Sequence, residues 1–172
     1  MKIHHDQTKV FAGLASLAAL LCGAPIDSAS AATATTTFQV TANVVATCSV
    51  SAGTVAFGNY SGAVVNTTST IVATCTDTTP YNVGLSAGLG VGATVSGRLM
   101  TNTADTLDTL HYDLFKDSAR TSEWGNTIGT DTVTGTGNGL GQTLTMYAQI
   151  PAGQLPDPGT SYADTISVTL TY

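Results

Sequence analysis

The side chains that could form a catalytic site gather around His111, which is the only histidine after residue 31. Asp108 and Asp113 lie close to it in the sequence, so a hydrogen-bonded pair of histidine and carboxylate could form there. A hydrolase of the Ser–His–Asp class would also need a positioned serine and an oxyanion pocket. The pattern of the chain predicts neither. We therefore expect His111 to be a strand or core-edge residue, and we predict no catalytic residue.

The sequence gives as little support for a metal site or a nucleotide site as it gives for a catalytic site. Asp105, Asp108 and Asp113 could bind calcium, but their spacing is not that of an EF-hand loop. The run from Gly135 to Gly141 is rich in glycine, yet it does not fit the Gly-x-Gly-x-x-Gly pattern, and we expect it to be a flexible connection. We predict no metal and no cofactor.

Cys48 and Cys75 are the two cysteines that remain once the N-terminal leader is set aside. An even number of cysteines in an exported chain predicts a disulfide. The chain-entropy model gives about 3.6 kcal/mol for a closed loop of about 27 residues. The alternative is a structural zinc site, which takes four ligands, and only His111 could supply a third nitrogen or sulfur. We therefore predict a Cys48–Cys75 disulfide.

Residues 1–31 have the three parts of a secretory signal peptide. A positively charged start precedes an apolar run over 10–24, and Ala29-Ser30-Ala31 supplies the small residues of a cleavage site. The apolar run is shorter than the roughly 20 residues of a membrane-spanning helix. Cys22 could be a lipoprotein cysteine, but the later cleavage site disfavours that alternative. We expect cleavage after Ala31 and export of the remainder.

The composition favours strands and argues against nucleic acid as a partner. The formal net charge is −6, and only 9% of the residues are charged while 42% are hydrophobic. A surface that binds nucleic acid needs a basic patch, which this chain does not predict. Thr, Gly, Ala and Val dominate, as in proteins made of strands and turns.

Two alternating runs bound the mature chain. Their apolar positions are Phe38, Val40, Ala42 and Val44 near the N-terminus, and Ile166, Val168, Leu170 and Tyr172 at the C-terminus. Period-two alternation indicates a strand with one buried face. Because a strand edge without a neighbour readily pairs with another chain, we predict that one of these runs forms a strand that pairs with another molecule.

Further strands are predicted between the two runs. Extended segments are predicted at 66–75, 81–88, 96–100, 107–116 and 144–150, and the last strand is expected over 162–172. Turn signals fall in the segment 55–62. About seven or eight strands with turn clusters between them and no convincing helix indicate a β-sandwich. Trp124 is expected to be a packed aromatic near a turn, and the alternative is an exposed aromatic that aids adhesion.

Several motifs follow one another in a characteristic order. They are Phe57-Gly58-Asn59-Tyr60, Cys75 followed by Pro80-Tyr81-Asn82-Val83, the run 110–117 with Arg120 and Trp124-Gly125, Tyr162-Ala163-Asp164-Thr165, and the terminal run 168–172. In this order and spacing they resemble the spore coat protein U domain family, which includes the major subunits of archaic, Csu-type chaperone–usher pili. The resemblance covers essentially all of the mature chain.

The resemblance implies an all-β fold: an incomplete immunoglobulin-like β-sandwich of the pilin type that lacks one strand. A periplasmic chaperone lends the missing strand first, and the N-terminal segment of the next subunit replaces it in the fibre. After the signal peptide (1–31), residues 32–47 would be the donor strand segment and 48–172 the sandwich domain. Phe38, Val40, Ala42 and Val44 would enter the groove of a neighbour. Ile166, Val168, Leu170 and Tyr172 would edge the groove and pair with the chaperone.

The leading hypothesis is a structural pilus subunit that polymerises by donor-strand exchange and mediates surface attachment and biofilm formation. Its partners would be copies of itself, a periplasmic chaperone and an outer-membrane usher, and it would pass through the periplasm to the cell surface. The alternative is a secreted spore-coat or matrix protein of the same family that forms no fibre. A secreted hydrolase is disfavoured by the lack of a catalytic constellation, and a tip adhesin by the lack of room for a receptor-binding domain.

Overall fold

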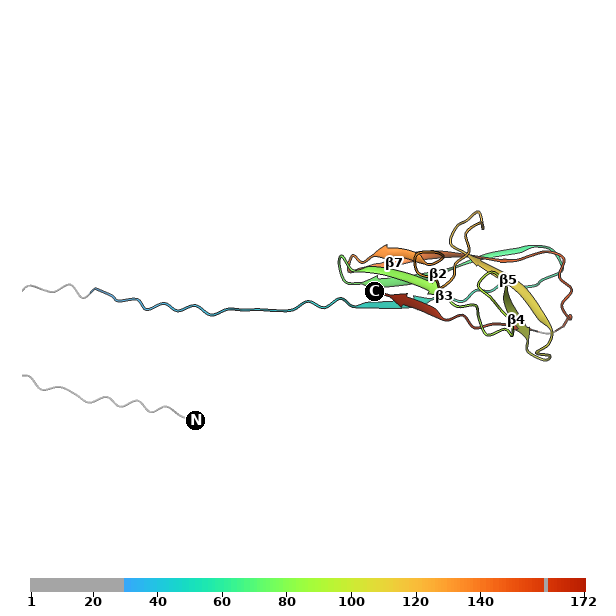
Figure 1. The fold of residues 1–172 in the computed structure, drawn as a ribbon, viewed down its shortest axis with the longest axis horizontal. Helices are drawn as coiled ribbons and strands as arrows, with labels where there is room; N and C mark the ends of the chain where they lie inside the picture. The colour runs from blue at the N-terminus through green and yellow to red at the C-terminus, as the bar shows by residue number, and fades with distance from the viewer. Residues whose placement is uncertain (1–29, 160) are drawn as a thin grey trace, which may run out of the picture. The chain divides into compact units, whose positions relative to one another are not determined.

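The computed structural model describes residues 30–159 and 161–172, and their regular secondary structure consists of strands alone (Figure 1). The strands are β1 (Cys48–Ala52), β2 (Val65–Cys75), β3 (Pro80–Leu85), β4 (Arg98–Asn102), β5 (Thr109–Phe115), β6 (Val133–Thr136), β7 (Gly141–Ile150), β8 (Tyr162–Ala163) and β9 (Val168–Thr171). The predicted all-β fold is confirmed. This part of the chain holds no helix long and apolar enough to span a bilayer. The predicted signal peptide lies outside the described residues except for its last two.

The strands form two antiparallel sheets. The larger sheet has the order β1-β2-β7-β5-β4-β8, and the smaller has the order β6-β3-β9. The longest ladder joins β2 to β7, from Val65 opposite Ile150 to Thr74 opposite Gly141. β1 and β9 are the last strands of their sheets, so each has one edge with no strand neighbour among the described residues.

The core lies between the sheets and is built by the alternation of the long strands. Ile71, Ala73 and Cys75 of β2 are buried, while Val72 and Thr74 between them are not. Buried side chains from the other strands are Tyr81, Val83, Leu85, Leu110, Tyr112, Leu114, Met146, Ala148 and Ile150. Trp124 is 0% exposed, and its indole Nε1 donates to the Val83 carbonyl at 2.8 Å. The packed-aromatic prediction for Trp124 is therefore confirmed, and the adhesive alternative is wrong.

The prediction of a flexible connection from Gly135 to Gly141 is wrong at both ends. Val133–Thr136 forms β6, which pairs with β3 from Thr136 opposite Pro80 to Val83 opposite Val133. Glycine suits this strand because a Cβ at Gly135 would lie 2.4 Å from Cζ of Tyr81, so only a bare backbone can pack on that ring. Gly141 already belongs to β7.

The prediction of one continuous last strand over 162–172 is also wrong. The segment divides into β8, which pairs with β4, and β9, which pairs with β3 in the other sheet. Asp164 lies between the two, and its carboxylate accepts hydrogen bonds from Tyr112 Oη at 2.6 Å and from the Leu89 N–H at 2.7 Å. These bonds hold the chain where it crosses from one sheet to the other.

A buried guanidinium joins the two sheets from the inside. Arg98 is 0% exposed, and its nitrogens donate to backbone carbonyls of Ser86 (3.0 Å), Val95 (2.9 Å) and Trp124 (2.7 Å), with a longer bond of 3.4 Å to Leu85. Burial lowers the pKa of Arg98 by removing water from the charge, and the nearby Tyr112 and Glu123 oppose that shift. The charge is satisfied mainly by carbonyl dipoles.

The predicted disulfide is confirmed. Cys48 and Cys75 are bonded across directly paired positions of β1 and β2, with a Cα–Cα distance of 4.1 Å. The bond closes the chain at the point where β1 begins, so it fixes the first strand of the domain to the longest ladder of the larger sheet.

Replacing both cysteines by alanine should lower the free energy of unfolding by about 3.6 kcal/mol, because the unfolded chain regains the freedom of the closed loop. Urea unfolding of residues 32–172, followed by tryptophan fluorescence, measures the change. Dithiothreitol should destabilise the native chain by a similar amount and leave the double variant unaffected. An unchanged urea midpoint in both cases would contradict the prediction.

Candidate functional site

A groove opens between the two sheets, beside the strands that end them. One bank is residues 52–57, which begin at the last residue of β1, and the other is residues 162–168, which run from β8 into β9. The cavity between these banks has a volume of about 430 Å³. Its floor is apolar core, formed by Ile71, Leu85, Met100, Leu114 and Met146.

The groove continues into a second cavity of about 740 Å³. Residues 55–62 line one side of it, and residues 154–159 line the other. The two cavities share the lining residues Val55, Phe57, Met100 and Tyr162, so they are two parts of one groove.

The bank after β1 has no ladder of its own. The Gly53 N–H donates to the Thr70 carbonyl at 2.8 Å, and regular pairing with β2 ends there. Val55 and Phe57 are half-buried against the core while Thr54 and Ala56 are exposed, so the bank alternates like a strand. The Phe57 ring meets Tyr112 edge-on, with centroids 6.0 Å apart. The groove can therefore accept an extended chain that pairs its backbone with the banks and buries every second side chain.

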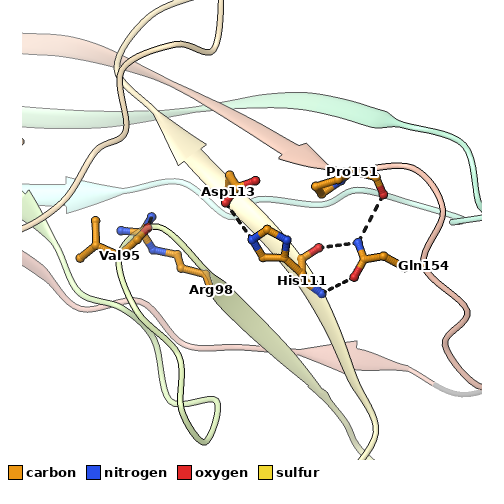
Figure 2. A network of polar contacts seen from close by, with 6 residues as sticks. All are labelled: Val95, Arg98, His111, Asp113, Pro151 and Gln154. Atoms are coloured by element: carbon orange, nitrogen blue, oxygen red, sulfur yellow. Dashed lines mark hydrogen bonds and ion pairs between the residues drawn. The ribbon is translucent and has the colours of Figure 1, made fainter.

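Beyond the end of β7, the side chain of Gln154 makes the backbone hydrogen bonds to β5 that a paired strand would make. β7 ends at Ile150, and Pro151 has no N–H to donate. Figure 2 shows the Gln154 amide in its place: Oε1 accepts from the His111 N–H at 2.7 Å, and Nε2 donates to the His111 carbonyl at 2.9 Å. Tyr60 binds the same loop, since its Oη donates to the Pro151 carbonyl at 2.9 Å. These bonds fix residues 151–154 beside the wall of the second cavity.

His111 has the place that the sequence predicts for it. It lies on β5, and its Nε2 is 2.9 Å from Oδ1 of Asp113 in the same strand (Figure 2). Asp108 is elsewhere and accepts hydrogen bonds from Tyr162 Oη and from Asn102 Nδ2, which together lower the pKa of Asp108. Within the described residues, no group of three or more histidine, cysteine or acidic side chains could hold a metal ion.

Sequence reasoning passed over one motif with the spacing of a nucleophile elbow, Gly84-Leu85-Ser86-Ala87-Gly88. A nucleophile elbow needs a strand, a sharp turn and a helix. Here Ser86 follows β3 and leads into a loop that reaches β4. Its Oγ accepts hydrogen bonds from the N–H groups of Gly88 (3.3 Å) and Ser167 (2.9 Å). Ser86 therefore ties the loop after β3 to the start of β9.

The sequence predicts four groove residues near the C-terminus. Val168 and Leu170 lie in β9, Ile166 precedes this strand and Tyr172 follows it. Ile166 and Val168 line the groove, Leu170 is half-buried against the core, and Tyr172 is 60% exposed. Burial raises the pKa of Tyr112, on the floor between the banks, and its hydrogen bond to Asp164 adds to the shift. The bank at Val55 and Phe57 was missed, although its alternation was visible in the sequence.

The N-terminal alternating run forms no strand in this chain. Residues 30–47 are extended and exposed, and regular structure begins at Cys48. Exposure reaches 86% for Phe38, 81% for Val40 and 92% for Val44, and Ala42 is exposed as well. Large apolar side chains thus alternate with polar ones along an exposed, extended segment.

The comparisons with known proteins agree with this architecture. A family model described as Spore Coat Protein U domain matches residues 34–169. Protein U of Myxococcus xanthus is 37% identical over 177 residues, which cover 94% of this chain and 96% of that protein.

Among solved structures, one match is to a chain in the crystal structure of the CsuC–CsuE chaperone–tip adhesion subunit pre-assembly complex from archaic chaperone–usher Csu pili of Acinetobacter baumannii. The TM-score is 0.52 with 23% identity over 75% of this chain. At that identity the likeness is one of fold. The present chain spans 40% of the length of the chain it matches.

Proposed function

This chain belongs to the spore coat protein U domain family, and on that premise we propose that it is a structural subunit of a surface fibre built by donor-strand exchange. The observation that carries the proposal is the apolar groove, whose two banks adjoin β1 and β9 at the edges where both sheets stop. A groove of this kind is completed by one more strand. The role is structural, and no step of it requires a catalytic residue.

The donor is the exposed segment 32–47 of a second copy. It has no proline and no charge, so its backbone can pair along its length and its side chains can enter an apolar groove. Phe38, Val40 and Val44 would contribute roughly 1.5–3 kcal/mol each on burial, or on the order of 5–9 kcal/mol in total, with little from Ala42. Backbone pairing with both banks adds to this.

Assembly of this kind needs help before the donor arrives. A periplasmic chaperone would fill the groove with a strand of its own and pair along Ile166, Val168 and Leu170, and an outer-membrane usher would direct exchange at the cell surface. The finished fibre would serve surface attachment and biofilm formation. The structural match comes from a complex of a chaperone with a tip adhesion subunit, which supports a chaperone as the first partner of this chain.

Deleting residues 32–45 tests the proposal. The truncated subunit keeps its groove and should still bind chaperone, but it has no donor and should form no fibres, whereas the chain from residue 32 should form them. Negative-stain electron microscopy of the purified chains, and co-purification with the chaperone, give the two readouts. Fibres from the truncated chain would show that the donor lies elsewhere.

A second candidate is a secreted coat or matrix protein that does not form a fibre. The description of the family as a spore coat protein domain favours it. Electron microscopy of surface material sheared from the cells separates the two, since fibres labelled by an antibody to this chain support the pilus and an unstructured labelled layer supports the coat.

A further inference from the structure

The smaller sheet has a second edge, which lies away from the groove. Its strand order is β6-β3-β9, so β9 ends the sheet beside the groove and β6 ends it on the opposite side. Among the described residues, no strand pairs with the outer edge of β6. An edge of this kind presents backbone N–H and C=O groups that can pair with another chain.

The hydrogen bonds of the sheet determine which groups of β6 face outward. The Gly137 N–H, one residue beyond β6, donates to the carbonyl of Thr79, one residue before β3, at 2.7 Å. Backbone groups of successive residues point to opposite sides of a strand, so Gly135 also bonds to β3. Thr134 and Thr136 therefore direct their N–H and C=O groups away from β3, and both residues are exposed.

The strands of the smaller sheet carry no charge that would repel a second copy. β6, β3 and β9 together contain no charged residue, although the chain has a formal net charge of −6. β6 also lacks proline, which would remove a backbone donor. Charges and prolines commonly prevent edge pairing in natural proteins, so their absence here favours it.

The edge of β6 is complementary to itself. When two copies of β6 meet antiparallel about a two-fold axis centred on Gly135, Thr134 of each copy lies opposite Thr136 of the other. Each of these two pairs exchanges both backbone hydrogen bonds, and the cross-strand threonine side chains make a favourable contact. A second copy of this chain thus satisfies all four outward groups of the edge.

We propose that the β6 edge is a lateral contact between fibres, in which the β6 strands of subunits in two neighbouring fibres pair antiparallel. Two four-residue strands bury far less than the roughly 1,600 Å² of a stable interface, so single subunits should not pair in this way. The contact recurs along a fibre, however, and multivalency turns weak contacts into firm association. This inference rests on the proposed function and adds to it the way in which fibres gather side by side.

Proline at the edge tests the pairing. Thr136→Pro removes an N–H that faces away from β3 and leaves the bonds between β6 and β3 in place, whereas Thr136→Val keeps both the N–H and the branched shape. Low-speed sedimentation and negative-stain microscopy of fibres from the chain starting at residue 32 measure bundling. We expect bundles from the native chain and from Thr136→Val. Thr136→Pro should give single fibres, with at least tenfold less material in the low-speed pellet and an unchanged total fibre yield.

A second set of variants tests the same edge without altering the backbone. Thr134→Lys with Thr136→Lys brings lysines of two copies face to face. The matched control is Thr143→Lys with Thr145→Lys, which has the same spacing on the exposed face of β7. Only the β6 lysines should abolish bundling, and added salt should restore part of it because salt screens the repulsion. These variants decide the question if Thr136→Pro fails to fold, as judged by Trp124 fluorescence.

The outcomes separate this inference from the proposed function. Native fibres that lie singly, or Thr136→Pro fibres that bundle like native ones, would overturn the inference and leave the proposed function intact. An equal loss of bundling from lysines on β6 and on β7 would also overturn it, since bundling would then depend on net charge and not on this edge. A native chain that forms no fibres would overturn both.

Discussion

A mature chain that carries Val40→Asp is expected to form no fibres, while Thr41→Asp is expected to assemble at close to the native yield. Val40 lies in the middle of the apolar positions of the donor segment, so its replacement would bury an unpaired carboxylate in the apolar groove. Thr41 is the next residue and, by the period of two, faces away from the groove. The two variants have the same charge and nearly the same position, and differ only in the face they alter.

Fibre yield by sedimentation, and the affinity of peptides 35–47 with each change for the groove of the truncated chain, are the measurements. Loss of the 1.5–3 kcal/mol from one buried apolar side chain alone predicts a peptide affinity lower by roughly ten- to a hundredfold, and the buried charge lowers it further. Equal effects of the two variants would rule out a one-faced donor strand. A stronger effect at Thr41 would place the opposite face in the groove.

Replacing Arg98 by methionine is expected to destabilise the domain by about 3–5 kcal/mol. Methionine can fill much of the space but donates no hydrogen bond, so the carbonyls of Ser86, Val95 and Trp124 lose their partner inside the core. Arg98→Lys should recover only part of the loss, because one ammonium cannot reach carbonyls on three separate segments.

Arg120→Met is the matched control. The half-buried Arg120 places its guanidinium 5.9 Å from the centre of the Tyr147 ring, a contact worth roughly 0.5–2 kcal/mol, so that variant should unfold closer to the native urea midpoint than Arg98→Met does. Urea unfolding followed by Trp124 fluorescence compares the three variants. If Arg98→Met and Arg120→Met shift the midpoint equally, the buried carbonyl network contributes no particular stability.

The strands with clean alternation could be predicted from the sequence because their periodicity reflects a buried and an exposed face. β2 and β7 are the clearest examples, and the disulfide followed from the cysteine count. β6 could not be predicted in this way, because Gly135 is required by the ring of Tyr81, and that contact joins residues far apart in the chain. The break between β8 and β9 was missed for the same reason, since it depends on bonds from Tyr112 and Leu89 to Asp164.

Only one of the two banks of the groove could be predicted from the sequence. Ile166 and Val168 alternate and line the groove, as their pattern suggested. Val55 and Phe57 alternate as well, but nothing in a sequence tells which strand edge remains unpaired, and that property makes them a bank. The burial of Arg98 could not be predicted from the sequence, because a lone basic residue is usually on the surface and its carbonyl partners come from separate segments.

In a fibre assembled through these segments, the position of the disulfide decides how a pulling force travels. Tension carried by one subunit's extended tail would reach the folded body at Thr47 and Cys48, and the covalent bridge would pass it at once to β2. The load would then act along the ten-residue register between β2 and β7 in shear, where many hydrogen bonds resist together, instead of peeling β1 away one bond at a time. An oxidised filament should accordingly withstand stretching that unravels a reduced one.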